Sequence, residues 1–273
     1  MNLREKLESL HSLRNLDKPQ NLTTEISTDL SECPVCGGIG WIISINEFGQ
    51  KEAVSCKCRE NILLKQRISF ADIPPVYKET RLNNFTLSAY QNPSEKRIAT
   101  AACKKIKTYL DYFSEYKKSG LGLYLYSETK GSGKTRMAAS LANKFLDDGY
   151  VVKFATSSRI LNAIKKTYDK DSKQKENELL EDLATTDILF IDDFGSENLT
   201  GWVNDKFYHI INERYINKKL TFFTSNVAVE HLDYDDRIKS RVQDMTYQIP
   251  FPEESVRQTQ ARERNKKLLS EIL

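Results

Sequence analysis

The stretch that decides the fold is residues 123–135, Leu-Tyr-Leu-Tyr-Ser-Glu-Thr-Lys-Gly-Ser-Gly-Lys-Thr. Its apolar first half predicts a buried strand, and its second half is a glycine-containing loop that ends in Gly-Lys-Thr. The next residues predict an amphipathic helix, because apolar side chains recur there at helical spacing, at Met137, Ala138, Leu141, Ala142, Phe145 and Leu146. A strand, a glycine loop and a helix in this order form the context in which such a motif binds phosphate.

The loop predicts how a nucleoside triphosphate would be held. Lys134 is expected to reach the β- and γ-phosphates, and the Thr135 hydroxyl to hold Mg²⁺. Backbone N–H groups of the loop and of the helix N-terminus would face the anion. The nucleotide-binding residues predicted in this way are Thr129, Lys130, Gly131, Ser132, Gly133, Lys134, Thr135 and Arg136.

One position departs from the pattern G-x-x-x-x-G-K-[ST], because Glu128 stands where the first glycine is expected. A carboxylate beside a triphosphate is repelled, so the Glu128 side chain is predicted to point outward. The alternative, a Gly/Ser turn without a ligand, is disfavoured because a matching acidic segment occurs downstream.

That acidic segment is residues 187–195, Asp-Ile-Leu-Phe-Ile-Asp-Asp-Phe-Gly. Its continuous apolar run predicts a central parallel strand that is buried on both faces. Asp192 and Asp193 follow at the carboxyl end of the strand, where α/β sheets bind ligands. Asp192 is expected to hold Mg²⁺, and Asp193 to orient or deprotonate the attacking water. Another predicted strand, 220–226, ends in Asn226, which is expected to hydrogen-bond the γ-phosphate or the water.

Four cysteines near the N-terminus have the spacing of a zinc site. Cys33 and Cys36 form a C-x2-C pair, and Cys56 and Cys58 follow after 19 residues as C-x-C. Four thiolates close a tetrahedral structural Zn²⁺ site. The residues between the pairs predict a small β-hairpin pinned by the metal, since so short a segment buries little apolar surface. The alternative is four unrelated reduced thiols.

The fifth cysteine, Cys103, is predicted to be an ordinary buried cysteine. It lies in a predicted helix that spans residues 94–118, with Ser94 as its N-cap.

The bulk composition excludes membrane and secreted classes. The 273 residues include 39% hydrophobic and 29% charged residues, with a net charge of +3. We expect a cytoplasmic protein that has no membrane segment.

Two charged or polar segments allow more than one interpretation. Leucines at 3, 7, 10, 13 and 16 predict a short helix, either packed on its own domain or docked to a partner. The lysine-rich stretch 165–175 is interpreted as a solvated charged loop, in preference to a DNA contact.

The order of these elements resembles that of AAA+ ATPases, and in particular the DnaC/DnaI-type replicative helicase loaders and the related IstB transposition helpers. The resemblance covers about residues 69–260 and rests on Gly-Ser-Gly-Lys-Thr, Ile-Asp-Asp-Phe-Gly, Thr-Ser-Asn and Arg-Ile-Lys-Ser-Arg. It implies an α/β fold, a P-loop AAA+ three-layer sandwich with a parallel five-stranded sheet and little or no helical lid. The zinc region would form a small additional N-terminal domain.

The resemblance also implies further site residues. Asn226 would be the sensor-1 residue, Arg241 the arginine finger that reaches a neighbouring subunit, and Arg257 the sensor-2 residue. The domains would be an N-terminal partner-binding region, 1–66, an extended connector, 67–93, and an AAA+ ATPase domain, 94–273. The implied partners are a replicative DNA helicase and single-stranded DNA, with homo-oligomers in the ATP-bound state. The implied cofactors are ATP, Mg²⁺ and Zn²⁺.

Three functions follow as hypotheses. The first is an ATP-dependent helicase loader that acts in replication initiation. The second is an IstB-type transposition helper ATPase, which the zinc region disfavours. The third is a nucleotide-gated adaptor with little hydrolysis, which Glu128 favours.

Overall fold

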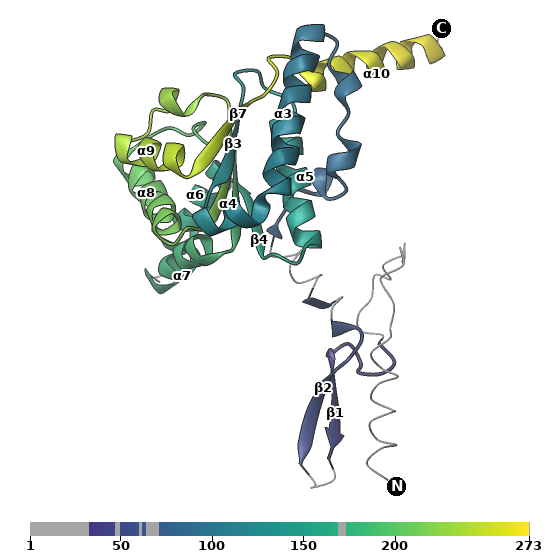
Figure 1. The fold of residues 1–273 in the computed structure, drawn as a ribbon, viewed down its shortest axis with the longest axis vertical. Helices are drawn as coiled ribbons and strands as arrows, with labels where there is room; N and C mark the ends of the chain where they lie inside the picture. The colour runs from purple at the N-terminus through teal and green to yellow at the C-terminus, as the bar shows by residue number, and fades with distance from the viewer. Residues whose placement is uncertain (1–32, 47–49, 60–61, 64–70, 169–172, 273) are drawn as a thin grey trace. The chain divides into compact units, whose positions relative to one another are not determined.

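The protein is described here by a computed structural model, which covers residues 33–46, 50–59, 62–63, 71–168 and 173–272. The chain divides into two compact units, residues 1–62 and 63–273 (Figure 1). The leucine-bearing segment 3–16, for which a short helix is predicted, lies outside the described residues.

The first unit contains the predicted hairpin. Strands β1 (Trp41–Ile45) and β2 (Lys51–Ser55) pair antiparallel, with Trp41 opposite Ser55 and Ile45 opposite Lys51. Every residue of both strands is exposed, so the hairpin has no apolar core of its own. The Arg59 guanidinium lies 3.5 Å from the centre of the Trp41 ring, which is a cation–π contact.

The second unit is built on a parallel sheet of five strands, as predicted, and the strand order is β4-β5-β6-β3-β7. The strands are β3 (Gly122–Tyr126), β4 (Val152–Thr156), β5 (Ile188–Asp192), β6 (Leu220–Ser225) and β7 (Thr246–Pro250). Every residue of β5 and β6 is buried, because helices cover both faces of the sheet. The carboxyl ends of all five strands therefore meet at one edge.

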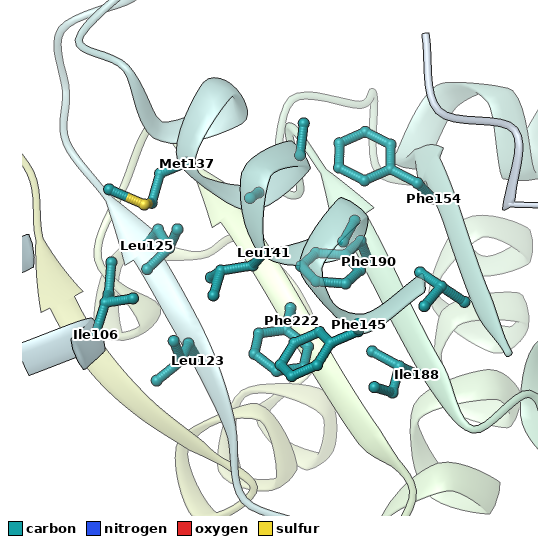
Figure 2. Packing of buried hydrophobic residues seen from close by; sticks show 14 of the residues in the cluster. Ile106, Leu123, Leu125, Met137, Leu141, Phe145, Phe154, Ile188, Phe190 and Phe222 are labelled. Atoms are coloured by element: carbon teal, nitrogen blue, oxygen red, sulfur yellow. The ribbon is translucent and has the colours of Figure 1, made fainter. Parts of the chain in front are cut away.

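One face of the sheet is covered by α3 (Pro93–Asp111), α4 (Phe113–Ser119) and α5 (Lys134–Asp147). Figure 2 shows Phe145 of α5 lying over Phe222 and close to Phe190, with Leu141 beside them. The Phe145 ring centre is 5.5 Å from that of Phe222, within the range of favourable aromatic pairs. This packing fixes α5, and with it the loop that precedes α5, against the middle of the sheet.

The other face is covered by α6 (Ser157–Tyr168), α7 (Lys173–Thr185), α8 (Gly201–Ile216) and α9 (Asp236–Asp244). In Figure 1 α8 and α9 lie on the opposite side of the sheet from α3 and α5. The three-layer sandwich is thus confirmed. After β7 the chain continues into α10 (Val256–Ile272). Among the described helices, none is both long and apolar enough to pass through a bilayer.

Three sequence predictions are corrected. The predicted helix 94–118 breaks at Tyr112 into α3 and α4, because rings on both helices pack on the same core. The N-cap of α3 is Asn92, not Ser94, since the Asn92 side chain accepts from the Ser94 N–H. Of the lysine-rich stretch 165–175, for which a loop is predicted, residues 165–168 belong to α6 and residues 173–175 to α7, whose Leu180 and Leu183 are buried.

The segment before α3 packs on α5. Its short 3-10 turns are η2 (Pro75–Tyr77), η3 (Leu82–Asn84) and η4 (Leu87–Ala89). The Asn143 amide on α5 donates to the carbonyl oxygens of Tyr77, at 2.9 Å, and of Thr80, at 2.8 Å. Tyr90 then donates through its hydroxyl to the Ser132 carbonyl at 2.7 Å, which ties this segment to the loop before α5.

Candidate nucleotide-binding site

The loop between β3 and α5 needs glycine at two points. Gly131 has φ +84° and Gly133 has φ +101°, a region that other residues rarely adopt. A side chain would also collide with neighbours, since a Cβ on Gly133 would lie 2.9 Å from the Tyr90 hydroxyl oxygen. The loop therefore folds tightly over the N-terminus of α5, where helix N–H groups favour an anion.

Lys134 is the first residue of α5 and its side chain folds back into the loop. Its Nζ donates to the carbonyl oxygens of Ser127, at 2.9 Å, and Thr129, at 3.0 Å, and to Ser132 Oγ at 3.3 Å. Only 6% of Lys134 is exposed. Desolvation lowers the pKa of Lys134 to about 8, although the Glu253 and Asp193 carboxylates partly oppose this. A charged amine surrounded by neutral acceptors is suited to receive a phosphate oxygen.

Thr135 brings the loop to the acidic strand. Its Oγ1 donates to Asp192 Oδ1 at 2.8 Å, across 57 residues of sequence. Thr224, on the neighbouring strand β6, donates to the same oxygen at 2.5 Å. Burial raises the pKa of Asp192 above its usual range, and the two hydroxyl hydrogen bonds oppose the rise. The two predicted magnesium ligands, Thr135 and Asp192, are therefore in direct contact.

Asp193 and Asn226 meet at the same strand ends. The Asn226 amide donates to Asp193 Oδ1 at 2.7 Å. Asp193 has φ +57°, in the left-handed region that costs energy for a residue other than glycine. Its backbone N–H donates to Thr224 Oγ1 at 2.9 Å, which holds this turn in place. The Asp193 side chain is exposed, so it is accessible to water and to a ligand above the loop.

The remaining loop residues differ in their surroundings. Glu128 is exposed, as predicted, and so is Lys130, while Ser132 is buried. The Arg136 guanidinium turns away along α5 and donates to the Asn84 carbonyl at 2.9 Å. The backbone of Arg136, in the first turn of α5, is thus the part of this residue that lies nearest the loop.

The two predicted arginines lie in different places. Arg257 is beside the loop, where its N–H donates to the Gly131 carbonyl at 3.4 Å. Arg241 is held on the surface of α8 and α9, where it donates to Asn212 Oδ1 at 2.9 Å and to the Tyr208 hydroxyl at 3.3 Å. The Arg241 contacts that the structure describes all lie on these two helices. This chain alone therefore does not bring Arg241 to its own loop.

Two residues of the site escape prediction from the sequence. Thr224 lies in a quoted motif, but only the strand register shows that its hydroxyl reaches Asp192. Glu253 lies in the connection between β7 and α10, and its carboxylate accepts from the N–H groups of Glu128 and Thr129. The local sequence around Glu253 carries no signal for this contact.

The four cysteines of the first unit converge. Their sulfur atoms all lie within 4.8 Å of one another, with 3.8 Å between Cys33 and Cys56 and 3.2 Å between Cys36 and Cys58. The thiols are free, and the Gly40 N–H donates to Cys36 Sγ at 3.2 Å. Tetrahedral zinc with Zn–S bonds of about 2.3 Å separates its sulfur ligands by about 3.8 Å, which the Cys33–Cys56 pair matches, while the Cys36 and Cys58 sulfurs lie closer together.

The sequence of this chain is similar to those of characterised replicative helicase loaders. The chain is 31% identical over 127 residues to the replicative helicase loader DnaI of Bacillus subtilis, which is 45% of this chain and 40% of that protein. It is 25% identical over 176 residues to the replicative helicase loader DnaC of Escherichia coli, which is 64% of this chain and 67% of that protein. The matched part thus spans less than half of DnaI and about two thirds of DnaC.

Solved structures of helicase loaders share the fold of this chain, and one family model matches its sequence. A crystal structure of the DnaC helicase loader superposes with a TM-score of 0.53 and 22% identity, over 65% of this chain and 99% of that chain. A crystal structure of DnaI gives a TM-score of 0.52 and 24% identity, over 66% and 94%. The family model described as IstB-like ATP binding protein matches residues 54–246, well over half of the chain. The glycine loop and acidic strand therefore sit in a chain that belongs to the family of IstB-like ATP binding proteins.

Proposed function

We propose that this chain is an ATP-dependent helicase loader, which binds a replicative DNA helicase and single-stranded DNA during replication initiation. ATP binding would favour the assembly that holds the helicase and the DNA, and ATP hydrolysis would release it. The observation that carries the ATPase part is the 2.8 Å hydrogen bond from Thr135 Oγ1 to Asp192 Oδ1, since it unites the loop and the acidic strand end. The relatives that load replicative helicases support the loader part.

The residues fit a nucleotide with magnesium. A threonine hydroxyl and a carboxylate are hard oxygen ligands of the kind that Mg²⁺ prefers, and Thr135 and Asp192 would hold it. When bound, the ion neutralises charge on the phosphates. Lys134 would release its loop carbonyls and donate to the β- and γ-phosphates. The loop N–H groups of residues 130–136 would surround the same oxygens, whereas the Thr129 N–H is taken by Glu253.

The second carboxylate and the amide beside it have a separate role in this proposal. Asp193 would orient the attacking water or accept its proton, and Asn226, which already donates to Asp193, would hold the water or the γ-phosphate. Arg257 lies close enough to the loop to act as the sensor-2 residue of the same chain. Arg241, held on α8 and α9, would serve a neighbouring subunit in an ATP-bound homo-oligomer.

Nucleotide binding is expected to weaken as the pH rises above 8. The pKa of Lys134 in the free protein is about 8, so the amine is charged below this pH and becomes neutral above it. Only the charged amine attracts phosphate, so the dissociation constant for an ATP analogue should rise about tenfold between pH 7 and pH 9. Titration calorimetry at both pH values measures this. A constant affinity across this range would contradict the assigned role of Lys134.

We propose that Cys33, Cys36, Cys56 and Cys58 bind one structural Zn²⁺ ion. The hairpin between the two pairs is exposed on all of its strand residues, so little apolar burial is available to stabilise it. In such small units, metal binding supplies the folding free energy. Four protein ligands leave no open coordination position, so the ion would have no catalytic role.

Removal of zinc should unfold the first unit and leave the second folded. Metal analysis of purified protein should find one zinc per chain, and Cys36→Ser should lower this content several-fold. Trp41 lies in the hairpin and gives a fluorescence signal for its loss of order. Cys103→Ser is the matched control, because Cys103 lies on α3 in the second unit. Protein that is free of zinc but retains the native Trp41 signal would refute the proposed site.

In this proposal, residues 1–66 bind the partner, residues 67–93 form a connector and residues 94–273 form the ATPase domain.

The test of the proposed function is co-purification with hexameric replicative helicases in the presence of ATP and of ADP, together with steady-state ATPase assays with and without single-stranded DNA. We expect helicase capture that depends on the nucleotide, and hydrolysis that responds to the DNA. We also expect the chain to be cytoplasmic.

The matched family model favours a second candidate, an IstB-type transposition helper. Its ATPase core would be nearly the same and its partner would be a transposase. Recovery of a transposase in place of a helicase would reverse the ranking. Nucleotide-dependent capture without measurable hydrolysis would instead favour the adaptor, in which Glu128 limits turnover.

A further inference from the structure

We propose that Glu253 is a positioning residue, which braces the phosphate loop from the connection between β7 and α10. This inference rests on the proposed nucleotide site but concerns a residue outside its motifs. The Glu253 carboxylate accepts from the Glu128 N–H at 2.9 Å through Oε1 and from the Thr129 N–H at 2.7 Å through Oε2. Both oxygens are thus used on two successive amides, where the loop leaves β3.

The segment that carries Glu253 contacts the loop at further points. Ser127 Oγ donates to the Pro252 carbonyl at 2.9 Å, and the Arg257 N–H donates to the Gly131 carbonyl. A Cβ on Gly131 would lie 2.8 Å from Ser255 Oγ, so a larger residue at 131 would push the two apart. Residues 252–257 therefore lie along the outer side of the loop from its beginning to its glycines.

The brace is itself anchored to the start of α3. The Glu253 N–H donates to Glu95 Oε2 at 2.6 Å. The neighbouring Glu254 carboxylate accepts from the N–H groups of Gln91, at 2.8 Å, and Asn92, at 3.1 Å. A side chain attached to a fixed backbone can restrain the loop, whereas one on a free segment would move with it.

Glu253 binds the end of the loop that lies farthest along the chain from α5. The phosphates are expected at the other end, at the N–H groups of Gly133 to Thr135 and at Lys134. The carboxylate therefore supports the loop without occupying the expected phosphate position. Its negative charge also acts on Lys134, where it favours the protonated amine that phosphate needs.

The brace contacts the loop at residue 128, the position at which this chain departs from the P-loop pattern. The P-loop pattern has glycine at this position, and this chain has Glu128 with its side chain exposed. The two N–H groups at 128 and 129 gain a carboxylate with one oxygen for each of them. Glutamine at 253 would offer a single acceptor oxygen, so Glu253→Gln should lose one of the two bonds and the charge while it keeps the shape.

The test compares Glu253→Gln with Glu253→Asp, and with Glu263→Gln as a control on an exposed position of α10. In the nucleotide-free protein, amide hydrogen exchange in the loop should be faster by about tenfold in Glu253→Gln. The dissociation constant of an ATP analogue should rise about tenfold, with kcat at saturating ATP within about threefold of the parent. Glu253→Asp should recover part of both effects, and the control should show neither.

The outcomes separate this inference from the proposed function. Tighter nucleotide binding by Glu253→Gln would mean that the carboxylate competes with phosphate, and would overturn the brace. Unchanged exchange and affinity would overturn it as well. If the parent protein binds no nucleotide, the proposed function fails, whereas the exchange measurement still decides whether Glu253 orders the loop.

Discussion

Lys134→Ala is expected to abolish measurable ATP hydrolysis. In the structure the Lys134 amine is buried and donates to three neutral oxygens of its own loop. Its pKa is about 8, so near neutral pH it is a poorly solvated cation whose described hydrogen-bond acceptors are all uncharged. Phosphoryl transfer depends on positioning and charge neutralisation, and loss of one such donor lowers kcat by about 100- to 1,000-fold. Affinity for ATP should also fall by about 10- to 100-fold, because a charge-assisted hydrogen bond is lost.

Steady-state phosphate release and titration with an ATP analogue measure the two effects. Lys134→Met keeps most of the apolar stem, so it separates loss of the charge from loss of packing. Lys144→Ala is the matched control, since Lys144 lies on the same helix and pairs on the surface with Asp148 at 3.0 Å. Hydrolysis by Lys134→Ala at the rate of the parent protein would show that the site has been assigned to the wrong residues.

Asp192→Asn is expected to lose hydrolysis without loss of stability. Asparagine keeps the oxygen that accepts from Thr135 and Thr224, but it removes the charge that would hold Mg²⁺. Turnover should therefore fall by about 100-fold or more, as for removal of a comparable electrostatic group. Desolvation raises the pKa of Asp192, so the ionised carboxylate is disfavoured by folding at neutral pH. The neutral amide removes this cost, and the melting temperature should stay equal or rise.

Asp187→Asn is the control, because Asp187 lies just before the other end of β5, exposed and 3.7 Å from Lys219. It should leave hydrolysis unchanged. The predicted combination, a large loss of turnover with equal or greater thermal stability, distinguishes a functional carboxylate from a structural one. An Asp192→Asn protein that unfolds, or one that hydrolyses ATP normally, would be incompatible with a magnesium ligand at this position.

The residues that sequence analysis placed best are those with a strong local pattern. Strand β5 is an unbroken apolar run, and the loop before α5 combines two glycines with Lys134, so both elements were predicted at nearly their observed bounds. Helix α7 was missed, because its buried leucines follow a lysine-rich stretch that is typical of a loop. The break at Tyr112 was missed for a related reason, since neither glycine nor proline marks it in the sequence, while rings on both sides of it, Tyr109 and Phe113, contact each other in the fold.

The sequence by itself determined the α/β class, the phosphate loop, the acidic strand end and the four-cysteine spacing, because each is written within a few neighbouring residues. The tertiary structure alone decided that Thr224 shares the Asp192 oxygen, that Arg241 rests on α8 and α9, and that Glu253 holds the loop. These contacts join residues 29 to 125 positions apart in the chain, from Arg241 and Asn212 to Glu253 and Glu128. Strand register and helix packing set such distances, and these depend on the whole core and not on any local pattern.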